Sequence, residues 1–123
     1  MRRLTPREAA VLGYLLSADF PGVSQLRAQA GEAKVKRDHT ESPNIEFEIE
    51  PSLPTAAVSS RVPVEARVNG SDPPVDILLF VENGVLDSLE LVTHESGALT
   101  EFPSPQELAE PTVNPWTLGK SGS

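Results

Sequence analysis

The chain has 123 residues, a formal net charge of −8 and no cysteine. This length predicts one domain with a single core, and the lack of cysteine excludes disulfides and thiolate-bound metals. The negative charge argues against binding to nucleic acid or anionic lipid, because phosphate groups would be repelled. No apolar run approaches the roughly 18 residues of a membrane-spanning helix, and Glu8 interrupts the first apolar stretch, so we expect a cytoplasmic protein without a signal peptide or a membrane partner.

Two helices are predicted at the N-terminal end. Residues 5–8 (TPRE) combine a hydroxyl N-cap, proline at the first helical position and glutamate at the third, which is a capping box. The helix should run over residues 5–17, and its apolar stripe comprises Val11, Leu12, Leu15 and Leu16. Residues 19–22 (DFPG) end it. A second, shorter helix is expected from about Val23, with Gly31 as its C-terminal stop.

After Gly31 the apolar period changes from 3.6 to 2, which predicts strands. Residues 44–50 (NIEFEIE) and residues 62–68 alternate between apolar and polar side chains. Residues 75–81 are nearly all apolar, which favours a central strand covered on both faces. Asn83-Gly84 is a strong signal for a type I′ hairpin, so the next strand, through residues 86–93, should run antiparallel to it.

The C-terminal end carries weaker signals. Residues 104–107 (SPQE) repeat the capping chemistry, but Pro111 limits this helix to one or two turns. Residues 112–123 are predicted to form a flexible tail, with Trp116 as its one candidate for docking. No fixed-period repeat is present.

These elements predict a single α+β domain over residues 1–111. Two N-terminal helices should pack on a four- to five-stranded antiparallel sheet, followed by a short C-terminal helix. The predicted core comprises Val11, Leu12, Leu15, Leu16, Phe20, Leu26, Ile45, Phe47, Ile49, Val64, Val68, Ile77, Leu79, Val81, Leu89 and Leu91.

The first helix resembles the opening helix of LuxR-type helix-turn-helix domains over about nine residues, through the pattern LTPRE followed by Val11 and Leu12. In that family a recognition helix enters the major groove of DNA. Here it would fall on residues 32–41, where only Ala33 and Val35 are apolar, so nothing would hold it on a core. A DNA-associated regulator that uses the helix over residues 5–17 is the alternative to our preferred interpretation.

No catalytic, cofactor-binding or metal-binding residues are predicted. His39 and His94 lack the spacing that would place two metal ligands on one helix face, and no G-x-S-x-G motif is present. The Gly119-Lys120-Ser121 sequence resembles the end of a phosphate-binding loop but has Asn114 where the first glycine should stand. A small hydrolase or lyase using His39 or His94 is a further alternative.

The row Glu46, Glu48 and Glu50 is the most distinctive predicted surface feature. It is either a solvated sheet face or a docking surface for a basic partner, because a cation would relieve the repulsion between neighbouring carboxylates. The sequence thus favours a non-enzymatic cytoplasmic protein-interaction module, with neutralisation of a basic partner as one form of its function.

Five stretches together resemble a family of small uncharacterised actinobacterial proteins over roughly residues 4–111: LTPRE, LLSADFPGVSQLRAQA, SSRVPVEA, ILLFVENGVLDSLEL and EFPSP. The resemblance implies a shared organisation and no activity, cofactor or functional residue. Members often carry a Cys-Gly-Cys-type turn before the strand at Ile45. This chain has RDHTESP at residues 37–43, so the resemblance implies no metal or redox function for that turn.

Overall fold

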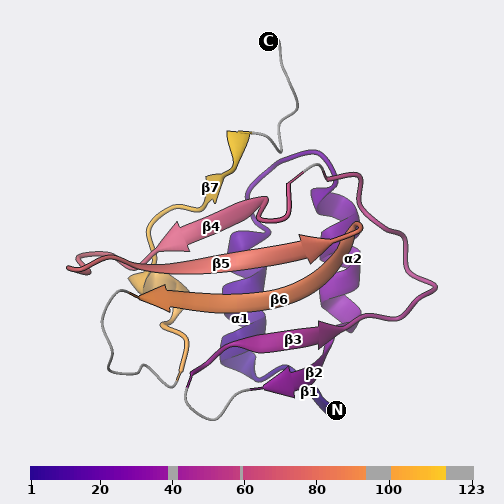
Figure 1. Ribbon diagram of the computed structural model, residues 1–123, viewed down its shortest axis with the longest axis horizontal. Coiled ribbons are helices and arrows are strands. Elements are labelled where there is room, and N and C mark those ends of the chain that lie inside the picture. Colours follow the sequence, from indigo (N-terminus) through magenta and orange to yellow (C-terminus); the bar gives the residue numbers. More distant parts are fainter. Residues whose placement is uncertain (39–41, 59, 94–100, 116–123) are drawn as a thin grey trace.

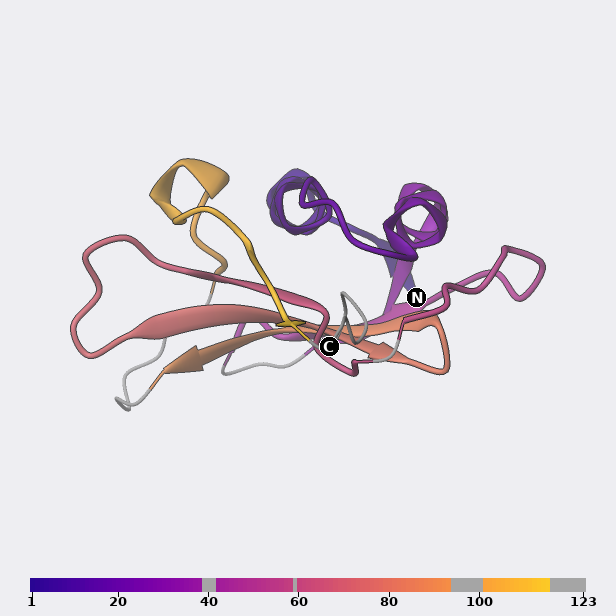
Figure 2. The same ribbon diagram turned by 90° about the horizontal axis from the view of Figure 1, so that it is seen from above.

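Two helices lie side by side on one face of an antiparallel sheet in the computed structural model, which describes residues 1–38, 42–58, 60–93 and 101–115 (Figure 1). The helices are α1 (Pro6–Leu15) and α2 (Val23–Glu32). Figure 2 views the sheet edge-on and shows both helices on the same side. The predicted α+β class is confirmed, and so is the packing of two N-terminal helices on an antiparallel sheet.

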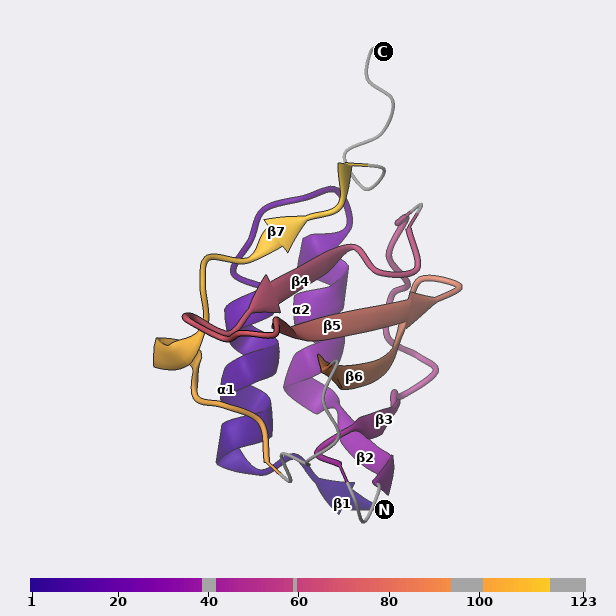
Figure 3. The same ribbon diagram turned by 60° about the vertical axis from the view of Figure 1, so that its left-hand side comes forward.

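In the described part of the chain the sheet has seven strands, in the order β1-β2-β3-β6-β5-β4-β7 (Figure 3). They are β1 (Arg2–Arg3), β2 (Lys34–Asp38), β3 (Ile45–Glu48), β4 (Val64–Arg67), β5 (Val75–Glu82), β6 (Val85–Thr93) and β7 (Thr112–Val113). The prediction of four or five strands was wrong. The two edge strands have two residues each, which is too short for an alternating pattern to appear in the sequence.

The start of α1 follows the predicted capping box. The Thr5 hydroxyl accepts a hydrogen bond from the Glu8 amide at 3.1 Å, and the Glu8 carboxylate accepts one from the Thr5 amide at 2.9 Å. The second helix begins after Gly22, whose φ of 93° lies in the left-handed region, and it continues through Gly31 to Glu32. Both apolar stripes face the sheet, as their spacing requires.

The hairpin formed by β5 and β6 is the longest ladder of the sheet, from Val75 opposite Thr93 to Glu82 opposite Val85. At its tip Asn83 and Gly84 have φ values of 54° and 77°. Positive φ at both central residues is what a type I′ turn requires, so the predicted hairpin is confirmed.

The pairing of β3 with β6 is much shorter, and we call this junction the seam of the sheet. It consists of two residue pairs, Ile45 with Leu89 and Glu46 with Ser88. Two side-chain amides accept hydrogen bonds from the backbone of β6, one beside the seam and one nearer the β5–β6 turn. The amide of Leu91 donates to the Asn44 side chain at 2.7 Å, and the amide of Leu86 donates to the Gln29 side chain at 2.9 Å.

The core lies between the helices and the sheet. Of the predicted core residues, only Ile49, Val68 and Leu91 are partly buried, and they still pack against it. Phe102 and Leu108 are buried although no periodic pattern marked them, because they lie in the irregular C-terminal segment.

That C-terminal segment departs from the prediction. The expected helix is a single 3₁₀ turn, η1 (Pro105–Glu107), because Leu108 already has extended backbone angles and bridges to Val68. Residues 112 and 113, expected to begin a tail, pair with β4 as β7, so the sheet extends past residue 111. Trp116 lies outside the described residues.

Candidate interaction surface

The sheet face opposite the helices, which we call the open face, is covered by no element among the described residues (Figure 2). Residues 75–81 were predicted to be covered on both sides, and this was wrong. Ile77 and Leu79 are fully buried under the helices, whereas Leu78 and Phe80 point the other way and are partly exposed. An apolar run therefore does not require two covered faces.

Strand register places carboxylates beside these two apolar side chains. Leu78 lies opposite Glu65 on β4 and opposite Glu90 on β6. Phe80 lies opposite Ser88, which in turn lies opposite Glu46 on β3. Residues that face each other across antiparallel strands share one side of the sheet. The centre of the open face is thus apolar and is flanked by Glu46, Glu65 and Glu90.

The cations on the β4 side of the open face already have carboxylate partners. Arg67 makes two hydrogen bonds to Asp76, at 2.9 and 3.2 Å, and these bonds raise the pKa of its guanidinium. Arg61 lies 3.1 Å from Glu82, and its guanidinium carbon is 5.8 Å from the centre of the Phe80 ring. Glu65 and Glu90 form no ion pair among the described residues, although Arg67, two residues along β4, attracts Glu65 electrostatically.

The three glutamates predicted as candidate partner-binding residues do not form one uniform row. Glu46 and Glu48 lie on β3 and are partly buried, while Glu50 lies beyond the end of the strand and is exposed. Arg37 lies across the ladder from Glu46, and Lys34 lies across from Glu48. Opposite charges at facing positions attract, so β2 partly offsets the negative charge of this row. The sequence alone did not reveal this pairing.

A hollow of about 380 Å³ opens along the seam, lined by Asn44, Ile45, Glu46, Asp87, Ser88 and Glu90. The Ser88 hydroxyl is buried and donates to the Glu90 carboxylate at 2.9 Å. With Asp87 exposed at the rim, three carboxylates line this hollow.

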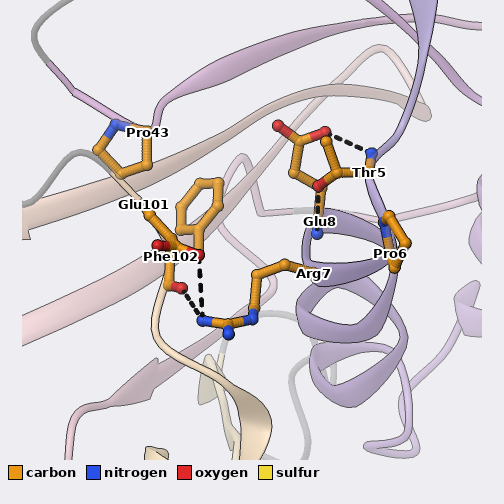
Figure 4. Close-up of a pocket in the computed structure, with 7 residues that line it drawn as sticks. All are labelled: Thr5, Pro6, Arg7, Glu8, Pro43, Glu101 and Phe102. Carbon is orange, nitrogen blue, oxygen red and sulfur yellow. Dashed lines mark hydrogen bonds and ion pairs between the residues drawn. The ribbon is translucent and has the colours of Figure 1, made fainter.

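Another hollow, of about 520 Å³, lies at the start of α1 between Thr5, Pro6, Arg7, Glu8, Pro43, Glu101 and Phe102 (Figure 4). Arg7 extends across it, donating to the Phe102 carbonyl at 2.7 Å and lying 3.7 Å from the Glu101 carboxylate. The Thr5 hydroxyl and the Glu8 carboxylate both accept the hydrogen bonds of the capping box. The hollow therefore brings together no nucleophile with a base.

The residues of the alternative interpretations fall in different places. His39, His94 and residues 119–121 lie outside the described residues. Within the described ranges, no group of three or more histidine or acidic residues could hold a metal ion, and no helix is long and apolar enough to cross a bilayer. Of the expected recognition helix at residues 32–41, residues 34–38 form β2, so a strand follows α1 and α2.

Comparison of the chain with protein-family models, with curated proteins and with solved structures finds no match.

Proposed function

We propose that this chain is a non-enzymatic protein-interaction module that binds a basic protein partner through the open face of its sheet. The observation that carries the proposal is an uncovered sheet face whose apolar centre, Leu78 and Phe80, is flanked by Glu46, Glu65 and Glu90. The proposal assigns no catalytic residue, cofactor or metal, and it places the protein in the cytoplasm, as expected from the sequence.

The two kinds of side chain contribute differently to such binding. Burying the partly exposed Leu78 and Phe80 against a partner removes apolar surface from water, which provides affinity. The surrounding carboxylates attract a basic partner from a distance and exclude acidic ones, which provides specificity and a faster association rate. The net charge of −8 reinforces this preference.

The preferred contact area is shifted from the one that the sequence indicated. Glu46 and Glu48 face cations on β2, so a basic partner would have to compete with Arg37 and Lys34 for them. Glu65 and Glu90 have no cation at a facing position in the ladder, because their common neighbour is Leu78. We therefore assign the larger electrostatic contribution to Glu65 and Glu90.

An NMR titration tests this assignment with a short amphipathic peptide of lysine and leucine as the probe. We expect backbone shifts on β4, β5 and β6, and we expect Glu65→Lys/Glu90→Lys to weaken binding roughly tenfold or more. The control Asp19→Lys/Glu32→Lys makes the same change in net charge at two exposed positions on the helix side. Equal weakening by both variants, or shifts confined to the helices, would refute the proposal.

A further inference from the structure

Half of the basic residues of the chain gather at one edge of the sheet. Five of its ten lysines and arginines lie on the two neighbouring strands β1 and β2, and we call them the basic edge: Arg2, Arg3, Lys34, Lys36 and Arg37. The antiparallel pairing of β1 with β2 brings the two sequence segments together, with Arg3 opposite Lys34. The N-terminus lies at the same corner (Figure 1).

Only Arg2 of the basic edge forms ion pairs with described residues, although Lys34 and Arg37 also face Glu48 and Glu46 across the β2–β3 ladder. Arg2 is held by Glu8 at 2.8 Å and by Asp38 at 3.0 Å. The other four cations of the basic edge form no ion pair with any described residue, whereas Arg7, Arg61 and Arg67 each have a carboxylate partner. A protein with a net charge of −8 thus keeps four cations without a direct ion pair to a described residue at one edge of its sheet.

The backbone at this edge is also incompletely paired. β1 pairs only with Lys34 and Val35, although β2 continues to Asp38, so the outer side of the last three residues of β2 has no strand partner in the described part of the chain. A hollow of about 260 Å³ lies there, lined by Met1, Arg2, Val35, Lys36, Arg37 and Asp38. Its lining thus combines residues 1–2 with residues 35–38 of β2.

We propose that the basic edge binds an extended acidic segment of another protein, which adds to β2 in line with β1. The main chain of that segment would pair with the backbone of Lys36 to Asp38, as in other cases where a peptide adds a strand to a sheet edge. Its carboxylates would meet Arg3, Lys34, Lys36 and Arg37. Main-chain pairing provides the position, and charge provides the selectivity.

The rest of the surface favours a short acidic peptide over a nucleic acid. Glu46 and Glu48 lie on the strand next to the basic edge, within the range of about 8 Å over which charges interact at physiological salt. A long polyanion that crossed this edge would approach these carboxylates. A segment that stays in line with β1 avoids them, and its backbone can use the free edge of β2, which a phosphate backbone cannot.

Fluorescence anisotropy tests the proposal with a labelled peptide of about eight alternating glutamate and valine residues as the probe. We expect binding that weakens as ionic strength rises from about 0.01 M to about 0.15 M. Lys36→Glu/Arg37→Glu should weaken it roughly tenfold or more, and the milder Lys36→Gln/Arg37→Gln should weaken it less. The control Arg61→Glu/Arg67→Glu makes the same charge change near the other edge of the sheet. This variant should retain most of the affinity for the peptide.

Further probes decide between strand addition and other modes of binding. The same peptide with alternate backbone nitrogens methylated keeps its charge but cannot pair as a strand, so undiminished binding would overturn strand addition. Stronger binding of an oligothymidylate or of anionic vesicles than of the peptide would also overturn the proposal. Thermal unfolding of each variant establishes that it is folded. A loss of binding can then be attributed to the changed side chains of the basic edge.

Discussion

The side chain of Gln29 links three separate segments of the chain through hydrogen bonds. Its side chain is only 1% exposed, yet each of its polar atoms has a partner. The amide nitrogen donates to the carbonyls of Pro54 and Gly84 at 2.9 and 3.0 Å, and the amide oxygen accepts from Leu86. α2, the loop before β4 and the β5–β6 turn are thereby held together by one residue.

Replacing Gln29 with leucine should therefore be costly. Gln29→Leu keeps a similar volume but leaves the backbone amide of Leu86 without its acceptor and removes one of the two donors to the Gly84 carbonyl, which keeps its bond from the Ala56 amide. We therefore expect the free energy of unfolding to fall by about 1–3 kcal/mol. Urea denaturation measures it. Gln25→Leu, on the same helix but bonded only to the exposed Ser24, should change the value by less than about 1 kcal/mol. Equal effects of the two substitutions would contradict the role assigned to Gln29.

Two glycines with similar backbone angles allow strain and crowding to be separated. Gly84 and Gly70 have φ values of 77° and 71°. A methyl group on Gly84 would collide with the backbone oxygen of Ala56, whereas one on Gly70 would meet nothing. Gly70→Ala should cost about 1–2 kcal/mol from left-handed strain alone, and Gly84→Ala distinctly more. Thermal unfolding of both variants checks this order, and a reversed order would contradict the packing of the turn.

The sequence predicted the Asn83-Gly84 turn because that signal is local. It did not predict the role of Gln29, since the partners of this side chain are backbone atoms from two distant segments. Helical periodicity marks Val23, Leu26 and Ala30 and treats position 29 as polar. A buried glutamine becomes understandable only when the loops above it are in place.

At the scale of elements, Arg2 and Glu8 join the edge strand β1 to helix α1. Arg2 donates to both carboxylate oxygens of Glu8, at 2.8 and 2.9 Å. Burial raises the pKa of Glu8, but the hydrogen bonds from Arg2 and from the Thr5 backbone lower it by more, so the pKa lies below its ordinary value of 4.5. Ionised Glu8 therefore stabilises the folded state more than protonated Glu8 does.

This contact should appear in the pH dependence of stability. The contribution of Glu8 is complete above its ordinary pKa and is lost as the pH falls through the lower folded value. Glu8→Gln retains a capping oxygen but not the charge, so we expect a loss of about 1–2 kcal/mol at neutral pH and a weaker decline in acid. Urea denaturation at a series of pH values measures both. An unchanged acid decline would show that other carboxylates produce it.

The predictability of the elements followed their length and regularity. The helices and the strands near residues 45, 64, 77 and 89 were predicted because their apolar side chains recur at the right period. β1 and β7 are fixed by pairing with β2 and β4, which lie far away in the sequence. Residues 104–107 do have the predicted capping chemistry, but they form only one 3₁₀ turn, because the backbone is extended from Leu108 onward.

At the scale of the whole molecule, the charges and the layers are both unevenly distributed. The helices cover one face of the sheet, the carboxylates flank the apolar centre of the other, and the unpaired cations lie at the β1–β2 edge. The row Glu46, Glu48 and Glu50 was predicted from alternation. Its cationic neighbours on β2, and the position of Glu65 and Glu90 beside Leu78, depend on strand order. Sequence periodicity carries no information about which strands become neighbours.

The single covered face leads to a further prediction about two adjacent residues of β5. Leu79 is fully buried against the helices, whereas Leu78 is partly exposed on the open face. Leu79→Ala should cost about 2–5 kcal/mol because it leaves a cavity, and Leu78→Ala should cost less than about half as much. Chemical denaturation of the two variants compares them directly. Similar losses would indicate that the open face is covered in the free protein.

The short seam between β3 and β6 also has a consequence for cooperativity. The sheet consists of two groups of strands: β1 to β3, and β4 to β7, which include the long hairpin. Only two residue pairs join these groups. Such groups can open as separate foldons, each with its own free energy. In native-state hydrogen exchange, amides of β2 and β3 should lose protection before those in the middle of the hairpin, so the basic edge would belong to the portion of the molecule that opens most readily.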